Sequence, residues 1–281
     1  MELLLCRGKR KLLRKDSRGL SPAISTVIMT AAIVVLVLVA MTYGQSYLTS
    51  SVAQNEFSTN QQFMVTTGLQ IDNVAWMIGR AQTIQYSSTY GSLQVLPQAL
   101  TYNVEINQGA GWVPLCTLQT GILMYNVPTS EYSLGNNYVK SLSSSNSSFL
   151  QAGPAAPDSY VYSIEKLPMS DGNYARIVIV PTIRMINNNV GGANYVEFYL
   201  PFLENGTSPG YSQSVTLICQ NVDQEVQGSV TQIQFVVTFP LAAQGFDSTF
   251  FPFPTLTETL PINGTVELYE GDVSVSVGLY S

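Results

Sequence analysis

Hydrophobic residues follow two different patterns along this chain of 281 residues, and the first is an unbroken apolar run. Residues 20–43 are uncharged and mostly apolar, and the next charged side chain is that of Glu56. Over residues 27–40 the apolar character would cover every face of a helix, so lipid or other copies of the chain must bury it. As a helix, residues 20–43 extend about 36 Å, enough to cross the hydrocarbon core of a bilayer. We therefore predict a transmembrane helix over residues 20–48.

The start of this helix carries its own local signals. Ser21 is suited to be the N-cap, because its hydroxyl can accept a hydrogen bond from a backbone N–H of the first turn. Pro22 then occupies the first helical position, where its missing N–H removes no helical hydrogen bond.

Residues 49–85 are predicted to continue the helix or to form a neck. Apolar residues recur at spacings of three and four, which favours a helix that turns amphipathic and reaches about Gln82. Gly44 and Gly68 are expected weak points, and the polar stretch 49–62 is also compatible with a flexible neck. The residues that carry the periodicity are Tyr43, Tyr47, Ile71, Val74, Ile78 and Ala81.

After Ser87 the second pattern begins, in which apolar and polar residues alternate with a period of two. Many short strands with Gly, Asn, Ser and Pro clusters between them favour an antiparallel β-sandwich, which we assign to residues 86–281. The expected fold class is therefore α+β, with a long N-terminal apolar helix followed by this β-sandwich head. The strand candidates are 102–106, 112–118, 121–126, 159–165, 175–186, 194–200, 214–220, 232–239 and 273–279.

Three stretches of the head allow more specific expectations. Residues 136–158 form the longest irregular segment and are predicted to be a surface loop. Residues 175–186 are apolar but contain Pro181, which predicts a buried strand with an interruption. The aromatic, proline-rich segment 245–254 is either a contact patch for a neighbouring subunit or a loop packed over one end of the sandwich.

Charge divides the chain into a basic arm and an acidic body. Residues 1–19 hold seven basic and two acidic side chains, a net charge of +5, and the remaining chain has a net charge of −11. A nucleic-acid partner is not expected for so acidic a body. A basic arm before an apolar helix instead predicts a cytoplasmic N-terminus and an exported head.

The composition argues against an enzyme. Histidine is absent, which removes the usual general base and the commonest metal ligand. No catalytic, cofactor-binding or metal-binding constellation stands out. The segments 171–173 and 270–272 could contribute ligands to a calcium site, but neither follows an EF-hand or β-roll pattern, and both are predicted to be hairpin turns.

Two kinds of modification are suggested by an exported head. Cys116 and Cys219 remain if the arm that holds Cys6 is removed, and they either pair in a disulfide or stay as buried free thiols on strands. Three Asn-x-Ser/Thr sequons, at Asn146, Asn205 and Asn263, are expected in loops or turns where a glycosyltransferase has access.

The segment from Lys15 to Ile28 resembles the class III signal peptide of archaeal type IV pilins and archaellins. These proteins carry a basic leader that ends in a small residue, followed by an apolar helix that stays in the mature protein. The resemblance places cleavage between Gly19 and Leu20, with Arg18 in the basic flank. It covers roughly residues 7–45. The glutamate that bacterial pilins carry at the fifth mature position is here Ile24, and the sequence after Leu20 is closer to adhesive pilins than to archaellins.

The resemblance implies a filament subunit that is held in the cell membrane and then assembled on the cell surface, where it serves adhesion. Its implied partners are other copies of the chain, a prepilin-peptidase-like protease, a membrane assembly platform and a cytoplasmic ATPase. The alternative is an uncleaved, single-pass surface protein whose β-domain binds an envelope component or a ligand.

Overall fold

The computed structural model describes residues 22–143, 147–190, 193–207 and 213–278. The chain divides into two compact units, residues 1–48 and residues 49–281, which are described separately below.

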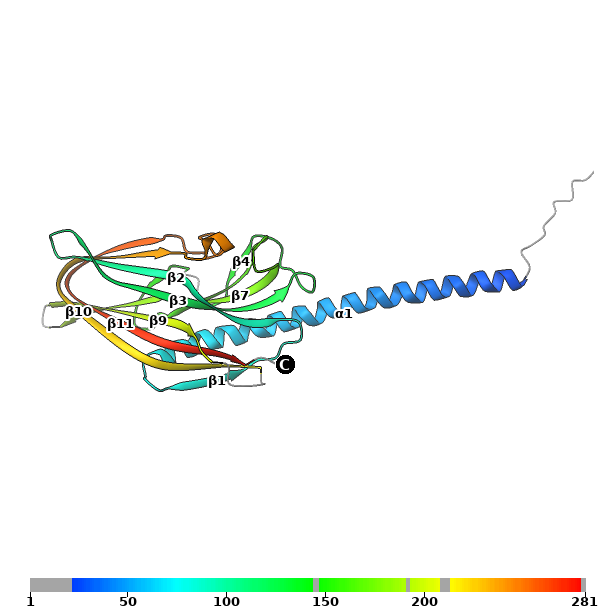
Figure 1. Cartoon of the computed structure of the whole chain (residues 1–281), viewed down its shortest axis with the longest axis horizontal. Helices are drawn as coiled ribbons and strands as arrows, with labels where there is room; N and C mark the ends of the chain where they lie inside the picture. Colours follow the sequence, from blue (N-terminus) through cyan, green and yellow to red (C-terminus); the bar gives the residue numbers. More distant parts are fainter. Residues whose placement is uncertain (1–21, 144–146, 191–192, 208–212, 279–281) are drawn as a thin grey trace, which may run out of the picture. The chain divides into compact units, whose positions relative to one another are not determined.

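A single α-helix, α1, runs from Pro22 to Ala75, a length of 54 residues (Figure 1). It continues without a break through Gly44, Gly68 and the polar stretch 49–62, so the helix rather than a flexible neck occupies this region. It ends earlier than the periodicity predicted, because the segment that begins at Ala81 forms a strand paired with the head.

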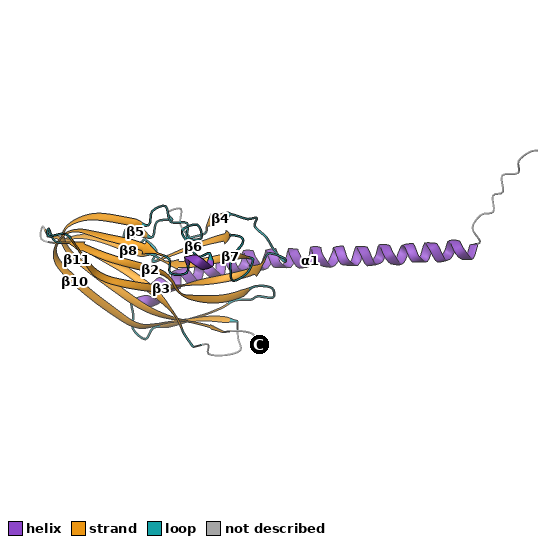
Figure 2. Ribbon diagram, turned by 45° about the horizontal axis from the view of Figure 1, so that its top comes forward, coloured by secondary structure: helices purple, strands orange, loops and turns teal. Residues whose placement is uncertain are grey.

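Where the structure describes it, the head is built of strands and the short 3-10 helix η1 (Ala242–Gln244), as Figure 2 shows. Several of the short strands expected from the sequence are joined into longer ones. The strands are β1 (Ala81–Gln85), β2 (Ser92–Asn107), β3 (Trp112–Pro128), β4 (Tyr138–Ser141), β5 (Leu150–Ala152), β6 (Ser159–Glu165), β7 (Tyr174–Pro181), β8 (Ile183–Val190), β9 (Ala193–Asn205), β10 (Ser214–Thr238) and β11 (Thr257–Gly278).

These strands form one mixed sheet, so the prediction of an antiparallel sandwich is not confirmed. The order is β4-β6-β7-β3-β2-β10-β11-β9-β8-β5, with β1 paired to β10. Most pairs are antiparallel, but β11 with β9 and β5 with β8 are parallel. Period-two alternation predicts strands without specifying their neighbours, which is why the sequence did not reveal the parallel pairs.

Chain continuity requires this sheet to curl strongly. Only Thr182 separates β7 from β8, although six steps in the strand order lie between them. In a flat sheet those steps would amount to about 29 Å, whereas the two residue steps from Pro181 to Ile183 span at most about 7 Å. The hydroxyl of Tyr102 on β2 donates a hydrogen bond of 2.7 Å to the carbonyl of Pro181, at the point where β7 ends and the chain enters β8.

The curled sheet has a hydrophobic core on each face. One core lies between strands from both ends of the strand order and includes Tyr102, Tyr162, Phe198 and Phe235. The other packs the helix within residues 57–75 against the opposite face of β2, β3, β7, β10 and β11. Strands β6 and β7 are covered on both faces, which explains why their sequences are continuously apolar rather than alternating.

The structure answers the three specific expectations for the head. The strand interrupted near Pro181 is confirmed as β7 followed by β8. The aromatic segment 245–254 packs into the core, with Phe250 and Phe251 fully buried. The surface loop predicted for 136–158 is wrong in part, because this segment contributes β4 and β5 and buries Phe149 completely.

Gly68 allows the helix to approach the sheet closely. A Cβ at this position would lie 2.9 Å from both the Ser159 hydroxyl oxygen and a Val161 methyl group. The Ser159 hydroxyl donates a 3.0 Å hydrogen bond to the carbonyl of Gly68. Glycine is required here because any side chain would keep the helix and the sheet from this close contact.

We expect Gly68→Leu to destabilise the head by about 3 kcal/mol, because a packed interface has no room for four extra carbon atoms. Gly44 is the matched control, since nothing lies within 4 Å of its Cβ position. Gly44→Leu is expected to leave stability unchanged or to raise it by up to about 1 kcal/mol through helix propensity. Denaturant unfolding followed by tryptophan fluorescence measures both, and equal effects of the two changes would contradict this account of Gly68.

Candidate functional site

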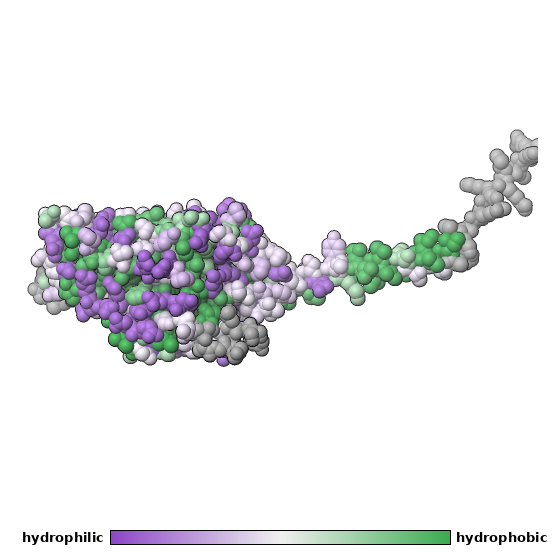
Figure 3. Space-filling view, in the orientation of Figure 1, coloured by the Kyte–Doolittle hydropathy of each residue, from purple (hydrophilic) through white to green (hydrophobic). Residues whose placement is uncertain are grey.

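The N-terminal half of α1 presents an apolar surface on every side. Its large hydrophobic side chains between Ile24 and Leu48 are all exposed, from 46% for Val39 to 76% for Tyr43 and Tyr47. Figure 3 shows this hydrophobic surface along the helix. By length and composition α1 is a candidate membrane span, with a mean hydropathy of 2.7 in its most apolar window.

Two threonine hydroxyls within this apolar half are bonded to the helix backbone. The hydroxyl of Thr30 donates to the carbonyl of Thr26 at 2.8 Å, and that of Thr42 donates to the carbonyl of Val39 at 2.9 Å. Since a bilayer or a helix bundle offers few partners for a lone hydroxyl, these bonds make the segment compatible with either environment.

The residues predicted for processing lie at and before the start of this helix. Pro22 is its first residue, as its restricted φ and missing N–H suggested. Arg18, Gly19, Leu20 and Ser21 lie outside the described residues.

The C-terminal half of α1 has only one buried face. Its buried positions recur at alternating spacings of four and three, a stripe that packs against the sheet. Sequence reasoning found only its last turns, because polar residues interrupt the stripe. The positions of this stripe are Ala53, Phe57, Asn60, Met64, Thr67, Ile71 and Val74, and the adjacent Gly68 and Ala75 are buried as well.

Glu56 fastens the beginning of this stripe to the loop before β2. Its carboxylate accepts hydrogen bonds from the Ser88 hydroxyl (2.7 Å), from the backbone N–H groups of Thr89 (2.8 Å) and Gly91 (2.9 Å), and from the Tyr125 hydroxyl. Burial alone would raise the pKa of Glu56, but these bonds together outweigh it and lower the pKa. The first charged residue after the apolar run is therefore an ionised anchor of the helix.

A second anchor lies at the end of the stripe. Asp158, which is completely buried, accepts a 2.9 Å hydrogen bond from the indole N–H of Trp76. Arg184 pairs with Asp72 at 3.0 Å and contacts Asp158 at 3.2 Å. Burial, followed by hydrogen bonding and repulsion from Asp72, raises the pKa of Asp158 to about 9. Arg184 thus faces two carboxyl groups, and the raised pKa of Asp158 favours the protonated form of that residue.

This arrangement predicts a pH-dependent stability of the head. A carboxyl group whose pKa is raised on folding stabilises the fold fully below its ordinary pKa of 3.8, and this contribution declines as the pH rises toward 9. Asp158→Asn, which mimics the neutral form, is expected to flatten the fall in Tm between pH 5 and 8. The control Glu105→Gln, on β2, removes a carboxylate that contributes to none of the raised or lowered pKa values and should keep the wild-type slope. Identical slopes for Asp158→Asn and the wild type would contradict the assignment of the proton.

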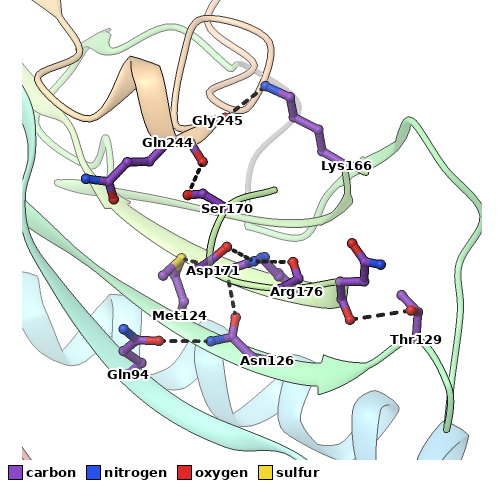
Figure 4. A network of polar contacts seen from close by, with 12 residues as sticks. Gln94, Met124, Asn126, Thr129, Lys166, Ser170, Asp171, Arg176, Gln244 and Gly245 are labelled. Atoms are coloured by element: carbon purple, nitrogen blue, oxygen red, sulfur yellow. Dashed lines mark hydrogen bonds and ion pairs between the residues drawn. The ribbon is translucent and has the colours of Figure 1, made fainter. Parts of the chain in front are cut away.

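Arg176 on β7 is a fully buried cationic residue, with a side chain that is 1% exposed. Its guanidinium donates two hydrogen bonds to Asp171, at 2.8 and 2.7 Å, and one of 3.3 Å to the side-chain oxygen of Asn126 (Figure 4). Its charge also lies 5.0 Å from the centre of the Tyr174 ring. Asp171 lies between the antiparallel strands β6 and β7, which confirms the predicted hairpin connection. Both oxygens of its carboxylate accept hydrogen bonds from Arg176.

The two cysteines of the head are free thiols, which resolves the alternatives against the disulfide. Cys116 on β3 packs against the core between the sheet's two ends, whereas Cys219 on β10 belongs to the core beneath the helix. The two cysteines therefore lie on opposite faces of the sheet. The Cys219 thiol donates to the carbonyl of Ala75 at 3.2 Å, at the end of α1.

One group of possible metal ligands occurs among the described residues. The ligand atoms of Cys116, Glu225 and Glu270 lie within 4.8 Å of one another. Burial raises the pKa of the Cys116 thiol, and burial together with neighbouring carboxylates raises that of Glu270. The prediction of a turn at 270–272 is wrong, because these residues lie inside β11.

The predicted glycosylation sites are placed differently from one another. Asn205 is exposed at the end of β9. Asn263 is also exposed but lies within β11, where a positive φ of 50° and a register shift mark an irregularity instead of the predicted loop. Asn146 lies outside the described residues.

Comparisons with protein-family models, curated proteins and solved structures find no match for this chain.

Proposed function

We propose that this chain is the structural subunit of an extracellular, type IV pilus-like filament that assembles through its N-terminal helix and serves adhesion. The observation that carries the proposal is the contrast within α1. Residues 24–48 expose hydrophobic side chains all round, whereas the half after residue 48 has one buried stripe and belongs to the β-rich unit. One continuous helix therefore has an apolar half that needs a partner and a half that is already packed.

Assembly is favoured by the energy of covering the apolar half. Burial of one Leu- or Ile-sized side chain contributes about 1.5–3 kcal/mol, so many such residues favour lipid or a helix bundle strongly over water. The absence of charge between Gly19 and Glu56 lets the segment move from lipid into a bundle without desolvating an ion.

The proposed route follows the resemblance to archaeal pilins. The basic arm holds the N-terminus on the cytoplasmic side until a prepilin-peptidase-like protease removes it before Leu20. An assembly platform and its ATPase then lift the helix from the membrane into the filament. The β-rich unit, with few charges and many polar uncharged residues, forms the exterior.

Mass spectrometry of the native N-terminus tests the proposal. We expect a chain that begins at Leu20, and we expect Gly19→Val to block processing because the peptidase site requires a small residue. Gly8→Val, in the same basic arm, is the matched control and should be processed normally. An intact arm in the mature membrane fraction would contradict the proposal.

The second candidate is an uncleaved, membrane-anchored surface protein. The exposed apolar half of α1 favours it equally, since a single span in lipid also buries every face. Analysis of filaments sheared from cells distinguishes the two candidate functions, because only a filament subunit would be found in them.

A further inference from the structure

A groove of about 420 Å³ lies on the sheet at β8, β9 and β11. It is lined by Asn188, Asn189, Tyr195, Glu197 and Glu267, and belongs wholly to residues 49–281. None of these residues takes part in the anchors of α1 described above.

Strand register brings the groove residues together in cross-strand rows. Glu197 on β9 is directly opposite Glu267 on the parallel strand β11, and Tyr199 is opposite Tyr269 in the next row. Tyr195 is opposite Asn188 on β8. Because neighbouring strands lie about 4.8 Å apart, the two carboxylates are close enough for one small ring to contact both.

The two carboxylates are held in place by neutral donors. The Tyr199 hydroxyl donates to Glu197 at 2.8 Å, and the Tyr269 hydroxyl donates to Glu267 at 2.8 Å. The rings of these tyrosines stack, with centroids 4.8 Å apart and planes 8° from parallel. Asn188 adds a 2.9 Å hydrogen bond to Glu197. The carboxylates therefore have fixed positions and retain acceptor capacity.

The two carboxylates face each other, and the nearest cation, the guanidinium of Arg184, lies on the ring of Tyr199, 4.9 Å from its centre. Facing carboxylates on neighbouring strands destabilise a sheet, and no lysine or arginine of the described residues lies within ion-pair distance of either one. The closest arginine by register, Arg184, pairs with Asp72 and Asp158. The hydroxyl of Tyr195 likewise has no hydrogen-bond partner in the described part of the chain.

We propose that this groove binds a neutral saccharide. Sugar hydroxyls donate strongly to fixed carboxylates and also accept from amide and phenol groups, while the C–H face of a sugar ring packs on an aromatic side chain. The groove offers all three kinds of partner: carboxylates from Glu197 and Glu267, an amide from Asn188, and an aromatic ring with a hydroxyl from Tyr195. A bare cation would use only the carboxylates, and the two tyrosine hydroxyls that already donate to them reduce its advantage. The inference deepens the adhesive part of the proposed function, on which it rests for its biological role.

Isothermal titration of the full chain, in a detergent without a sugar headgroup and with a chelator present, tests this inference. The probes are maltotriose, mannotriose and chitotriose, with Nα-acetyl-lysine methyl ester as the cationic competitor. We expect at least one trisaccharide to bind. Glu197→Gln should weaken it by about tenfold or more, as expected for loss of a charge-assisted hydrogen bond.

Two further variants separate binding from folding. Tyr195→Phe keeps the ring and removes only the hydroxyl, so it should weaken binding without changing Tm. Glu204→Gln lies on the same strand, is exposed and is outside the groove, so binding should stay within about twofold of the wild type.

Absence of binding by all three trisaccharides at millimolar concentration, binding of the lysine ester alone, or equal affinity of Glu197→Gln and Glu204→Gln would overturn the inference. These outcomes leave the N-terminal processing result untouched, because that result depends on Gly19 and not on the head. A failure of the saccharide inference is thereby distinguished from a failure of the filament proposal.

Discussion

Replacing Asp171 with asparagine is expected to lower the free energy of unfolding by about 3 kcal/mol, because it leaves the charge of Arg176 buried without a counter-charge. The Arg176 side chain is 1% exposed, and both of its terminal nitrogens donate to Asp171. The expected effect lies at the lower end for a broken buried ion pair, since the Asp171 side chain is 28% exposed and water reaches the site. Trp76 and Trp112, both in the unit of residues 49–281, supply the fluorescence signal for denaturant unfolding.

Two controls decide whether the buried charge is the cause. Asp223→Asn removes an exposed carboxylate from β10 and is expected to change stability by less than about 0.5 kcal/mol. Combining Asp171→Asn with Arg176→Met removes both charges and should recover part of the lost stability, because an apolar side chain of similar length fills the site. Equal losses for Asp171→Asn and Asp223→Asn would show that Arg176 does not depend on its partner.

The second large effect is expected for Leu36→Asp, in the middle of the apolar half of α1. Leu36 is 66% exposed, so the change does not disturb packing within the chain. An ionised residue at the centre of a membrane helix costs about 2.5–3.5 kcal/mol in insertion experiments, and a helix bundle offers it no better partner. We expect the variant to be lost from sheared filaments and depleted in the membrane fraction.

Asn55→Asp is the matched control for Leu36→Asp. Asn55 is exposed on the same helix but belongs to the β-rich unit, so the added charge stays in water. This variant should assemble normally. Filaments that contain Leu36→Asp at wild-type levels would exclude the apolar half of α1 as the assembly surface, and retention of the control only in membranes would favour the surface-anchor alternative.

Several elements of the fold were predictable because their signals are local. The apolar run and the Pro22 signal predicted the helix and its first turn, and continuous apolar residues identified the strand that is covered on both faces. The head's helix stripe was found only in part, since Asn60 and Thr67 occupy buried positions that a hydrophobicity pattern does not recognise. Each of these has a hydrogen bond that makes its burial acceptable, Asn60 to the carbonyl of Ser87 and Thr67 to that of Phe63.

The candidate sites divide in the same way. The sequons and the processing residues are short motifs and were readable directly, whereas the saccharide groove combines β8, β9 and β11, whose register no local pattern specifies. The disulfide alternative also depended on register, because cysteines on opposite faces of a sheet cannot pair.

By itself, the sequence determined that an uncharged, all-round apolar helix precedes an acidic, strand-rich head, since composition and periodicity report which surfaces leave water. Only the tertiary structure decided that the strands form one curled mixed sheet, that Glu56 and Asp158 anchor the helix to it, and that Glu197 faces Glu267. The physical reason is the separation along the chain over which each property acts. Burial preferences are properties of each residue and its near neighbours, whereas strand partners and charge pairs depend on residues that only the closed chain brings together.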